Sequence, residues 1–326
     1  MTTQLRATFV GLLLVAAVLV AAVTVTRHDS TGSTDQTGMA APVHSGIATP
    51  VRVGPYVALG DSYTSGPRIP AQTGRPAGCD RSDHNYPAHV ADQLDLRPSD
   101  IRDVSCSGAT LADLTTPQST KQGTNPAQLS AISRSTRLVT LGIGGNDIGF
   151  SDMITRCVTM GTAFKVLDRA KDMSSHDSPC RESYTDNGID SAEKRIAGLG
   201  AKYTSTLRDI RRRAPEARIY VVGYPAILPA GTTGCGRRLP LAPGDITYLR
   251  DKENELNTML KDQALSTGAT YVDTYEASRG HDACAAESTR WIEPIVPSNP
   301  AAAVHPNARG QRGMAKEVLR AIRAAG

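Results

Sequence analysis

Short apolar runs alternate with amphipathic stretches along most of the chain. The runs are typical of strands that are buried on both faces of a sheet, and they lie at Tyr56–Leu59, Ile101–Val104, Leu138–Ile143, Ile219–Val222 and Thr270–Val272. Apolar residues elsewhere recur at spacings of three and four, which predicts helices with one apolar face; they are Ile189, Ala192, Ile196, Leu199, Tyr203, Leu207 and Ile210, then Ile246, Leu249, Leu256, Leu260 and Ala264, and finally Met314, Val318 and Ile322. This alternation predicts an α/β domain whose five-stranded, mostly parallel sheet is covered on both faces.

The first 50 residues do not follow this pattern. Residues 1–27 contain an uncharged stretch at 7–26, which is longer than the hydrophobic part of most signal peptides and long enough to span a membrane. The stretch is therefore interpreted as either a signal peptide or an uncleaved N-terminal membrane anchor. A buried core helix is disfavoured because the stretch has no polar face. Residues 28–50 are small and polar, which indicates a flexible linker, and residues 51–326 form the predicted domain. Either reading of the N-terminus predicts a secreted or extracytoplasmic protein, and the anchor would tether it to the membrane.

The charge pattern excludes one class of partner. The chain has 36 Lys and Arg against 32 Asp and Glu, a net charge of +4, with both signs interspersed. A nucleic-acid-binding protein concentrates its basic residues, so we expect no nucleic-acid partner.

An even number of cysteines in an exported chain predicts disulfides. Fifteen pairings of six cysteines are formally possible, and the three well-separated pairs along the sequence favour nearest neighbours, Cys79–Cys106, Cys157–Cys180 and Cys235–Cys284. Their spacings fit no usual zinc-binding pattern. Neither a metal site nor an organic cofactor is expected.

Polar and small residues follow several of the predicted strands. The segments Gly60–Tyr63, Ser105–Gly108 and Gly144–Asp147 each come directly after an apolar run, and Val304–Asn307 precedes the last helix. Because ligands bind at the carboxyl ends of parallel strands, these segments are expected to meet. Ser62 would be a nucleophile activated by His305, and the N–H groups of Ser62 and Gly108 with the Asn146 carboxamide would stabilise an oxyanion.

The four segments, in this order, resemble the sequence blocks of the SGNH or GDSL family of serine esterases and lipases. The resemblance spans residues 55–320 and implies a flavodoxin-like three-layer α/β/α fold, with Ser62 and His305 as the catalytic pair and Ser62, Gly108 and Asn146 as the oxyanion hole. The cysteine pattern is similar to that of the secreted three-disulfide bacterial lipases of the family. The implied activity is hydrolysis of carboxylic esters, with lipid-like or other small ester substrates and a monomeric enzyme.

One position departs from the family pattern. The family usually has an Asp three residues before the His, and this chain has Ala302 there. Glu293 and Asp273 are the remaining acidic candidates for orienting His305. The simplest alternative is a backbone carbonyl of Ala302 or Ala303, which makes a Ser–His dyad, as in the secreted lipases that this chain resembles.

Other classes fit the sequence less well. A nucleotide-binding fold would need a glycine-rich phosphate loop after the first strand, and a conventional α/β-hydrolase would need a GxSxG elbow. An exported lipid- or carbohydrate-binding protein with little turnover and a carbohydrate deacetylase remain alternatives. Asp61 and Asp147 are expected to support their own loops, the remaining histidines to be structural or solvated, and Tyr63 and Trp291 to line either an acyl pocket or the core.

Overall fold

The computed structural model describes residues 53–167, 177–231 and 236–325, and its centre is a five-stranded parallel sheet. The strands are β1 (Tyr56–Gly60), β2 (Ile101–Asp103), β5 (Leu138–Gly142), β8 (Arg218–Val222) and β9 (Thr270–Val272). Their order in the sheet is β2-β1-β5-β8-β9, the flavodoxin-like order in which the chain reverses direction beside the first strand. All five strands lie where the apolar runs predict them, so the predicted fold class is confirmed.

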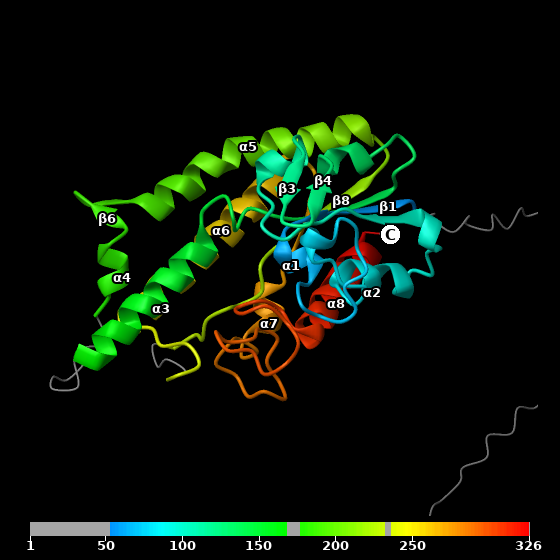
Figure 1. Ribbon diagram of the computed structural model, residues 1–326. Coiled ribbons are helices and arrows are strands. Elements are labelled where there is room, and N and C mark those ends of the chain that lie inside the picture. The colour runs from blue at the N-terminus through cyan, green and yellow to red at the C-terminus, as the bar shows by residue number, and fades with distance from the viewer. Residues whose placement is uncertain (1–52, 168–176, 232–235, 326) are drawn as a thin grey trace, which may run out of the picture. The chain divides into compact units, whose positions relative to one another are not determined.

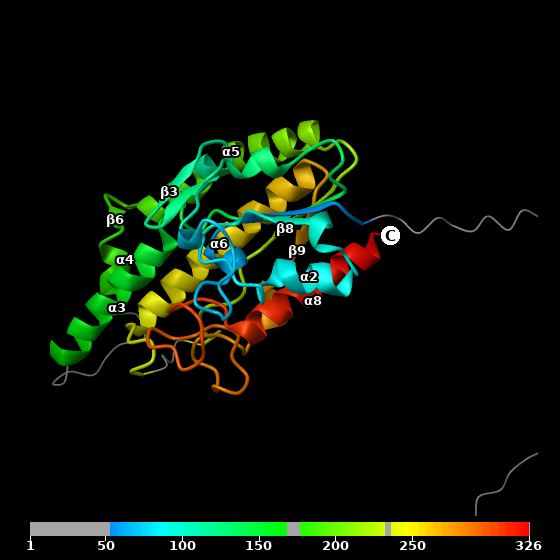
Figure 2. The ribbon, with the colours of Figure 1, turned by 45° about the vertical axis from the view of Figure 1, so that its right-hand side comes forward.

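Helices cover both faces of this sheet. The longer ones are α2 (Tyr86–Gln93), α3 (Phe150–Leu167), α5 (Ser191–Arg213), α6 (Pro243–Ser266) and α8 (Ala308–Ala324). Figure 1 shows α5 and α6 on one side of the strands and α2 and α8 on the other, and Figure 2 shows α2 and α8 lying side by side.

Successive side chains of each strand point to opposite faces of the sheet, and each face packs against one layer of helices. In β1, Val57 and Leu59 pack in the core with α5 and α6, whereas Tyr56 and Ala58 pack with α2 and α8. Each fully buried aliphatic side chain contributes about 1.5–3 kcal/mol to folding. The two apolar faces therefore fix the register of the strands, and β1 pairs with β5 from Tyr56 opposite Leu138 to Gly60 opposite Gly142.

The remaining elements are short and lie outside the sheet. They are the helices α1 (Ser62–Ser65), α4 (Pro179–Glu182) and α7 (Tyr275–Ser278), the 3-10 turns Ala77–Cys79, Pro98–Asp100, Leu111–Leu114 and Gln128–Ala131, and the antiparallel pairs β3 (Gln118–Thr120) with β4 (Gly123–Asn125) and β6 (Thr185–Asp186) with β7 (Ile189–Asp190). The sequence pattern missed both pairs. It also placed Ile189 on the apolar face of α5, which is wrong, because Ile189 is 62% exposed in β7 and the helix begins after the Asp190 cap.

Disulfides join Cys79 to Cys106 and Cys157 to Cys180. The first joins the segments that follow β1 and β2, and the second joins α3 to α4. The third predicted disulfide, Cys235–Cys284, includes Cys235, which lies outside the described residues. Across the described ranges, none of the helices has the length and apolar character that a membrane span requires.

Candidate active site

Three tight segments meet at the carboxyl edge of the sheet, beside the point where the strand order reverses. The first is Gly60–Tyr63, in which the Asp61 side chain caps α1 by accepting the Tyr63 N–H at 2.9 Å. Gly60 is required here because a Cβ at this position would lie 2.5 Å from the Gly142 carbonyl oxygen of the neighbouring strand. The cap and this close approach hold Ser62 at the first turn of α1.

Ser62 and His305 are in direct contact. The Ser62 Oγ lies 2.8 Å from His305 Nε2, and His305 Nδ1 lies 2.7 Å from the Ala303 carbonyl oxygen. A carbonyl only accepts hydrogen bonds, so Nδ1 carries the proton and Nε2 presents its lone pair to the hydroxyl. Burial lowers the pKa of His305 below its usual 6.5, which keeps the imidazole in the neutral form that accepts a proton.

The carboxylates named as alternatives do not contact the imidazole. The Asp273 carboxylate accepts the Glu276 N–H at 3.0 Å and caps α7, and the Glu293 carboxylate is bound elsewhere. Of the two carbonyls that the sequence suggested, Ala303 contacts Nδ1, whereas Ala302 accepts the backbone N–H of His305 at 3.3 Å.

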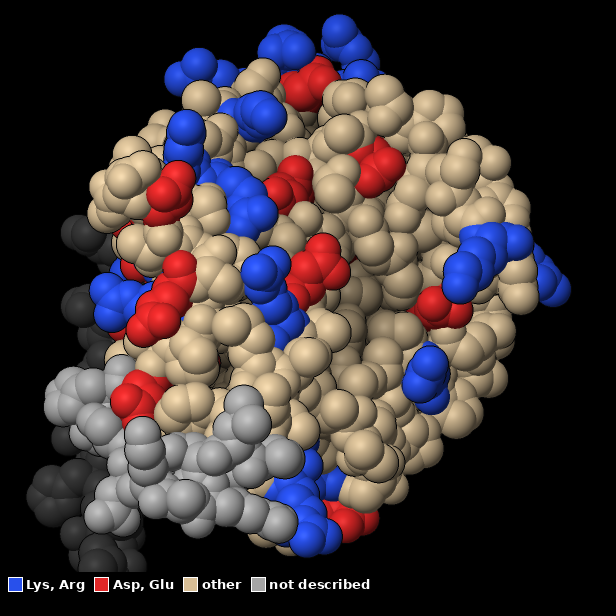
Figure 3. Space-filling view, turned by 60° about the vertical axis from the view of Figure 1, so that its left-hand side comes forward, with Lys and Arg blue, Asp and Glu red and all other residues tan. Residues whose placement is uncertain are grey.

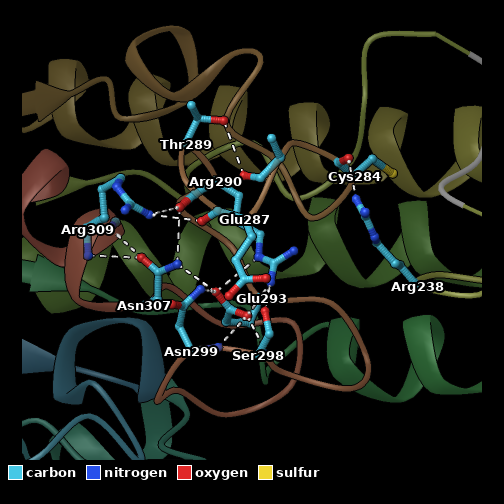
Figure 4. A network of polar contacts seen from close by, with 12 residues as sticks. Arg238, Cys284, Glu287, Thr289, Arg290, Glu293, Ser298, Asn299, Asn307 and Arg309 are labelled. Carbon is cyan, nitrogen blue, oxygen red and sulfur yellow. Dashed lines mark hydrogen bonds and ion pairs between the residues drawn. The ribbon is translucent and has the colours of Figure 1, made fainter. Parts of the chain in front are cut away.

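A buried polar network of Arg290, Glu293 and Asn307 contacts the segment that carries His305, and Figure 4 shows these side chains converging on Glu293. The backbone of Glu293 pairs with this segment, since its N–H donates to the His305 carbonyl and its carbonyl accepts the Val304 N–H, both at 3.0 Å. The Glu293 side chain is fully buried and forms an ion pair with Arg290 at 3.1 Å. Asn307 Nδ2 also donates to it, at 2.7 Å. Glu293 therefore fixes the segment and not the imidazole itself.

The groups expected to bind an oxyanion come from all three segments, Gly60–Tyr63, Ser105–Gly108 and Gly144–Asp147. Asn146 Nδ2 donates one hydrogen to the Ala109 carbonyl at 2.9 Å, which leaves its second hydrogen free. Gly108 has a φ of +78°, in the left-handed region that glycine adopts without strain. Within the described ranges, the N–H groups of Ser62 and Gly108 donate to no acceptor of the chain.

Two tyrosines hold the segments together: Tyr63, which the sequence placed in an acyl pocket or in the core, and Tyr224, which sequence reasoning did not assign. The Tyr224 hydroxyl accepts the Gly145 N–H at 2.8 Å and donates to Asp61 at 2.5 Å. The Tyr63 hydroxyl donates to the Val304 carbonyl at 2.6 Å, which ties α1 to the histidine segment. No sequence motif marks Tyr224, although its place directly after β8 is a signal that could have suggested it.

Both aspartates of the motifs are structural. Burial raises the pKa of Asp61 to about 7, although the bond from Tyr224 partly offsets it, and burial raises the pKa of Asp147 to about 6. Asp147 was expected to support its own loop; its carboxylate also accepts the Leu111 N–H at 3.1 Å and so holds the segment after Gly108.

An apolar cavity of about 120 Å³ opens beside the Ser–His pair. Its lining includes Tyr63 and Asn146 and the apolar side chains of Phe150, Ile154, Ile227, Leu256 and Ile295. Trp291 is absent from this lining and stacks on His281. On the face shown in Figure 3, acidic and basic side chains are interspersed. Within the described residues, no cluster of His, Cys, Asp and Glu has the makeup of a metal site.

A hydroxyl paired with a partly buried, neutral imidazole, at the edge of a flavodoxin-like sheet, is the arrangement of a serine-type hydrolase. The chain belongs to the GDSL-like Lipase/Acylhydrolase family, whose profile matches residues 58–312. It is 42% identical to Lipase 2 of Streptomyces coelicolor over 290 residues. The aligned region covers 88% of this chain and 90% of that protein. The chain is accordingly a carboxylic ester hydrolase.

Two solved structures are also similar. One is phospholipase A1 from Streptomyces albidoflavus NA297, with 28% identity and a TM-score of 0.64 over 84% of this chain and 100% of that one. The other is an extracellular lipase from Streptomyces rimosus, with 26% identity and a TM-score of 0.64 over 82% of this chain and 98% of that one.

Proposed function

We propose that the protein is an exported enzyme that cleaves lipid-like carboxylic esters through an acyl-enzyme on Ser62. The Ser62 Oγ would attack the ester carbonyl while His305 Nε2 takes its proton, and the imidazolium would then protonate the leaving alcohol. Water would follow the same route in the second half-reaction. The observation that carries this proposal is the 2.8 Å contact between Ser62 Oγ and His305 Nε2.

The orienting group in this mechanism is the Ala303 carbonyl. It accepts the Nδ1 proton both before and after proton transfer, so one imidazole orientation serves both half-reactions. We propose that the Ser62 and Gly108 N–H groups and the free hydrogen of Asn146 bind the oxyanion. The supporting observation is that these donors have no acceptor within the described chain.

The apolar cavity supports an acyl chain longer than acetyl, and all the groups of the site come from one chain, which supports a monomeric enzyme. Export is supported by the disulfides and by the extracellular lipase of Streptomyces rimosus. In this proposal residues 1–27 are a signal peptide or anchor, 28–50 a linker and 51–326 the catalytic domain.

A series of p-nitrophenyl esters with increasing acyl length tests this function. We expect kcat/KM to rise from acetate to medium-length chains as the acyl group buries more apolar surface, by about 0.8 kcal/mol per buried methylene. Fastest turnover of acetate would favour a deacetylase, and no turnover of any ester would favour a binding protein.

Replacing Asn146 with Ala is expected to lower kcat by about 10²–10³-fold with a smaller change in KM, because its amide would act chiefly in the transition state. Steady-state kinetics on one p-nitrophenyl ester measures this. The melting temperature of the variant controls for loss of the bond to Ala109. A kcat within threefold of the unsubstituted enzyme would exclude Asn146 from the oxyanion hole.

Replacing Glu293 with Gln is expected to destabilise the fold and to leave the chemistry nearly intact. The variant leaves the buried Arg290 guanidinium without its anion, which costs about 3 kcal/mol of unfolding free energy. Activity of the folded fraction should stay within about tenfold, because the carboxylate does not touch His305. Asp273→Asn is the matched control. It should change stability little, because an Asn side-chain oxygen accepts the Glu276 N–H about as well as Asp does, and its activity should likewise stay within about tenfold.

The stabilities of Glu293→Gln and Asp273→Asn should depend differently on pH. Burial raises the pKa of Glu293, but hydrogen bonds from Arg290 and Asn307 outweigh it and hold the pKa at about 2. A carboxyl with a depressed pKa stabilises the fold above its unfolded pKa of about 4.3 and loses that contribution as the pH falls towards 2. Denaturant unfolding at pH 2 to 6 should show this loss in Asp273→Asn and not in Glu293→Gln. A large loss of activity in either variant at neutral pH would show that a carboxylate orients His305.

A further inference from the structure

Arg68 is an exposed cation at the border of the Ser–His pair. Residues 61–67 and Ile69 are buried, and Arg68 alone in this stretch is exposed. The Pro67 carbonyl accepts the Ala302 N–H at 3.0 Å, so Arg68 adjoins the segment that carries His305. Its φ of +65° lies in the left-handed region, which costs a residue with a side chain about 1 kcal/mol or more.

This cation is unpaired and acts against the proposed chemistry. Within the part of the chain that the structure describes, the Arg68 side chain makes no ion pair or hydrogen bond. After burial, its charge is a further cause that lowers the pKa of His305. The imidazolium that forms during the reaction is therefore disfavoured by Arg68, and a negative charge bound to the guanidinium would remove that penalty.

The cavity lining indicates which part of a substrate would carry this charge. The lining beside Ser62 is mostly apolar and does not include Arg68. An acyl chain in the cavity leaves the alcohol part of the ester on the outer side of the Ser–His pair. The 67–68 turn bonds to Ala302, and neither Arg68 nor Ala302 lines the cavity, whereas the neighbouring Ala303 and His305 do.

Resting on the proposed function, we propose that Arg68 binds an anionic phosphate on the alcohol part of the ester, so that phospholipid-type esters are the preferred substrate class. A guanidinium matches a phosphate by paired charge-assisted hydrogen bonds. The bound phosphate would orient the ester and, by neutralising Arg68, make the imidazolium easier to form. Substrate binding and transition-state stabilisation thus come from the same contact.

The test compares two soluble substrates with the same acyl chains, dihexanoylphosphatidylcholine and dihexanoylglycerol, both below their micelle concentrations. In Arg68→Gln, kcat/KM should fall about tenfold on the phosphatidylcholine and should stay the same or rise a few-fold on the glycerol ester. Arg68→Lys keeps the charge but not the paired geometry and should lie between. Arg134→Gln removes an exposed cation just before β5, at the amino edge of the sheet, and should change neither rate.

Opposite or unequal effects on the two substrates are specific to a phosphate contact. An equal loss on both would mean that Arg68 only shapes its turn, and no change on either would mean that it binds nothing; both results overturn the proposal. A wild-type enzyme that hydrolyses neither ester would instead contradict the proposed function. Inorganic phosphate at millimolar concentration separates an esterified phosphate from a free one as the ligand of Arg68. Equal inhibition of wild type and Arg68→Gln would show that a free phosphate does not bind at Arg68. Stronger inhibition of wild type would show that a free phosphate suffices as the ligand.

Discussion

Ester hydrolysis by the Ser62→Ala variant is expected to fall by about 10⁶-fold, to a residual rate that binding and the oxyanion hole alone sustain. The alanine removes the oxygen that would form the bond to the acyl carbon, and no other hydroxyl within the described chain contacts His305. The measurement is kcat on a p-nitrophenyl ester, at enzyme concentrations high enough to see the residual rate.

Ser65→Ala is a matched control for that variant. Ser65 is a buried serine at the end of the same short helix, and its hydroxyl contacts Ser107 at 3.2 Å and does not contact the imidazole. Its activity should stay within a few-fold of the unsubstituted enzyme. If Ser62→Ala kept a tenth or more of the activity, a different nucleophile or an activated water would be at work.

The His305→Ala variant is expected to lose at least about 10³-fold in kcat, because the serine hydroxyl would then have to react without a base. The unsubstituted enzyme should show an acid limb in kcat/KM with an apparent pKa below 6.5, since burial and then Arg68 lower the pKa of His305. Activity is lost as the imidazole becomes protonated, so it should rise with pH through that value and then level off. In His305→Ala the residual rate should lack this limb.

An acid limb above pH 7, or one that persists in His305→Ala, would contradict the assigned base. Asp61 is the competing group for such a limb, because burial raises its pKa to about 7. Its carboxylate faces Tyr224 and the Tyr63 N–H and makes no hydrogen bond to the Ser62 hydroxyl. The pH profile therefore separates the two assignments.

The sequence predicted the sheet, and it predicted which segments meet at the candidate site. The central strands β1, β5 and β8 are buried on both faces, and their continuous apolar runs are visible without any tertiary information. The edge strands β2 and β9 are only partly buried. Parallel strands place their following loops at one edge, which is why Ser62, Gly108 and Asn146 could be grouped before the structure was seen. The choice of His305 depended on the family resemblance as well as on the chemistry of imidazole.

What the sequence could not supply depends on contacts between distant residues. The choice between the Ala302 and Ala303 carbonyls depends on the backbone turn at Val304, whose φ is +59°, and no residue type there specifies it. The Tyr224 bridge joins residues that are 163 positions apart in sequence. The sequence offered Glu293 only as a candidate for orienting His305, because its burial with Arg290 arises only when the loop between β9 and α8 folds back on itself.

Covalent labelling of the nucleophile tests the central claim most directly. The protein is incubated with a p-nitrophenyl alkylphosphonate, digested and analysed by mass spectrometry. The account predicts one phosphonate per chain, attached to the Ser62 side chain, with no label in Ser62→Ala and much slower labelling in His305→Ala. Stoichiometric label on any other residue, or full ester turnover in a protein that the reagent leaves unlabelled at Ser62, would contradict it.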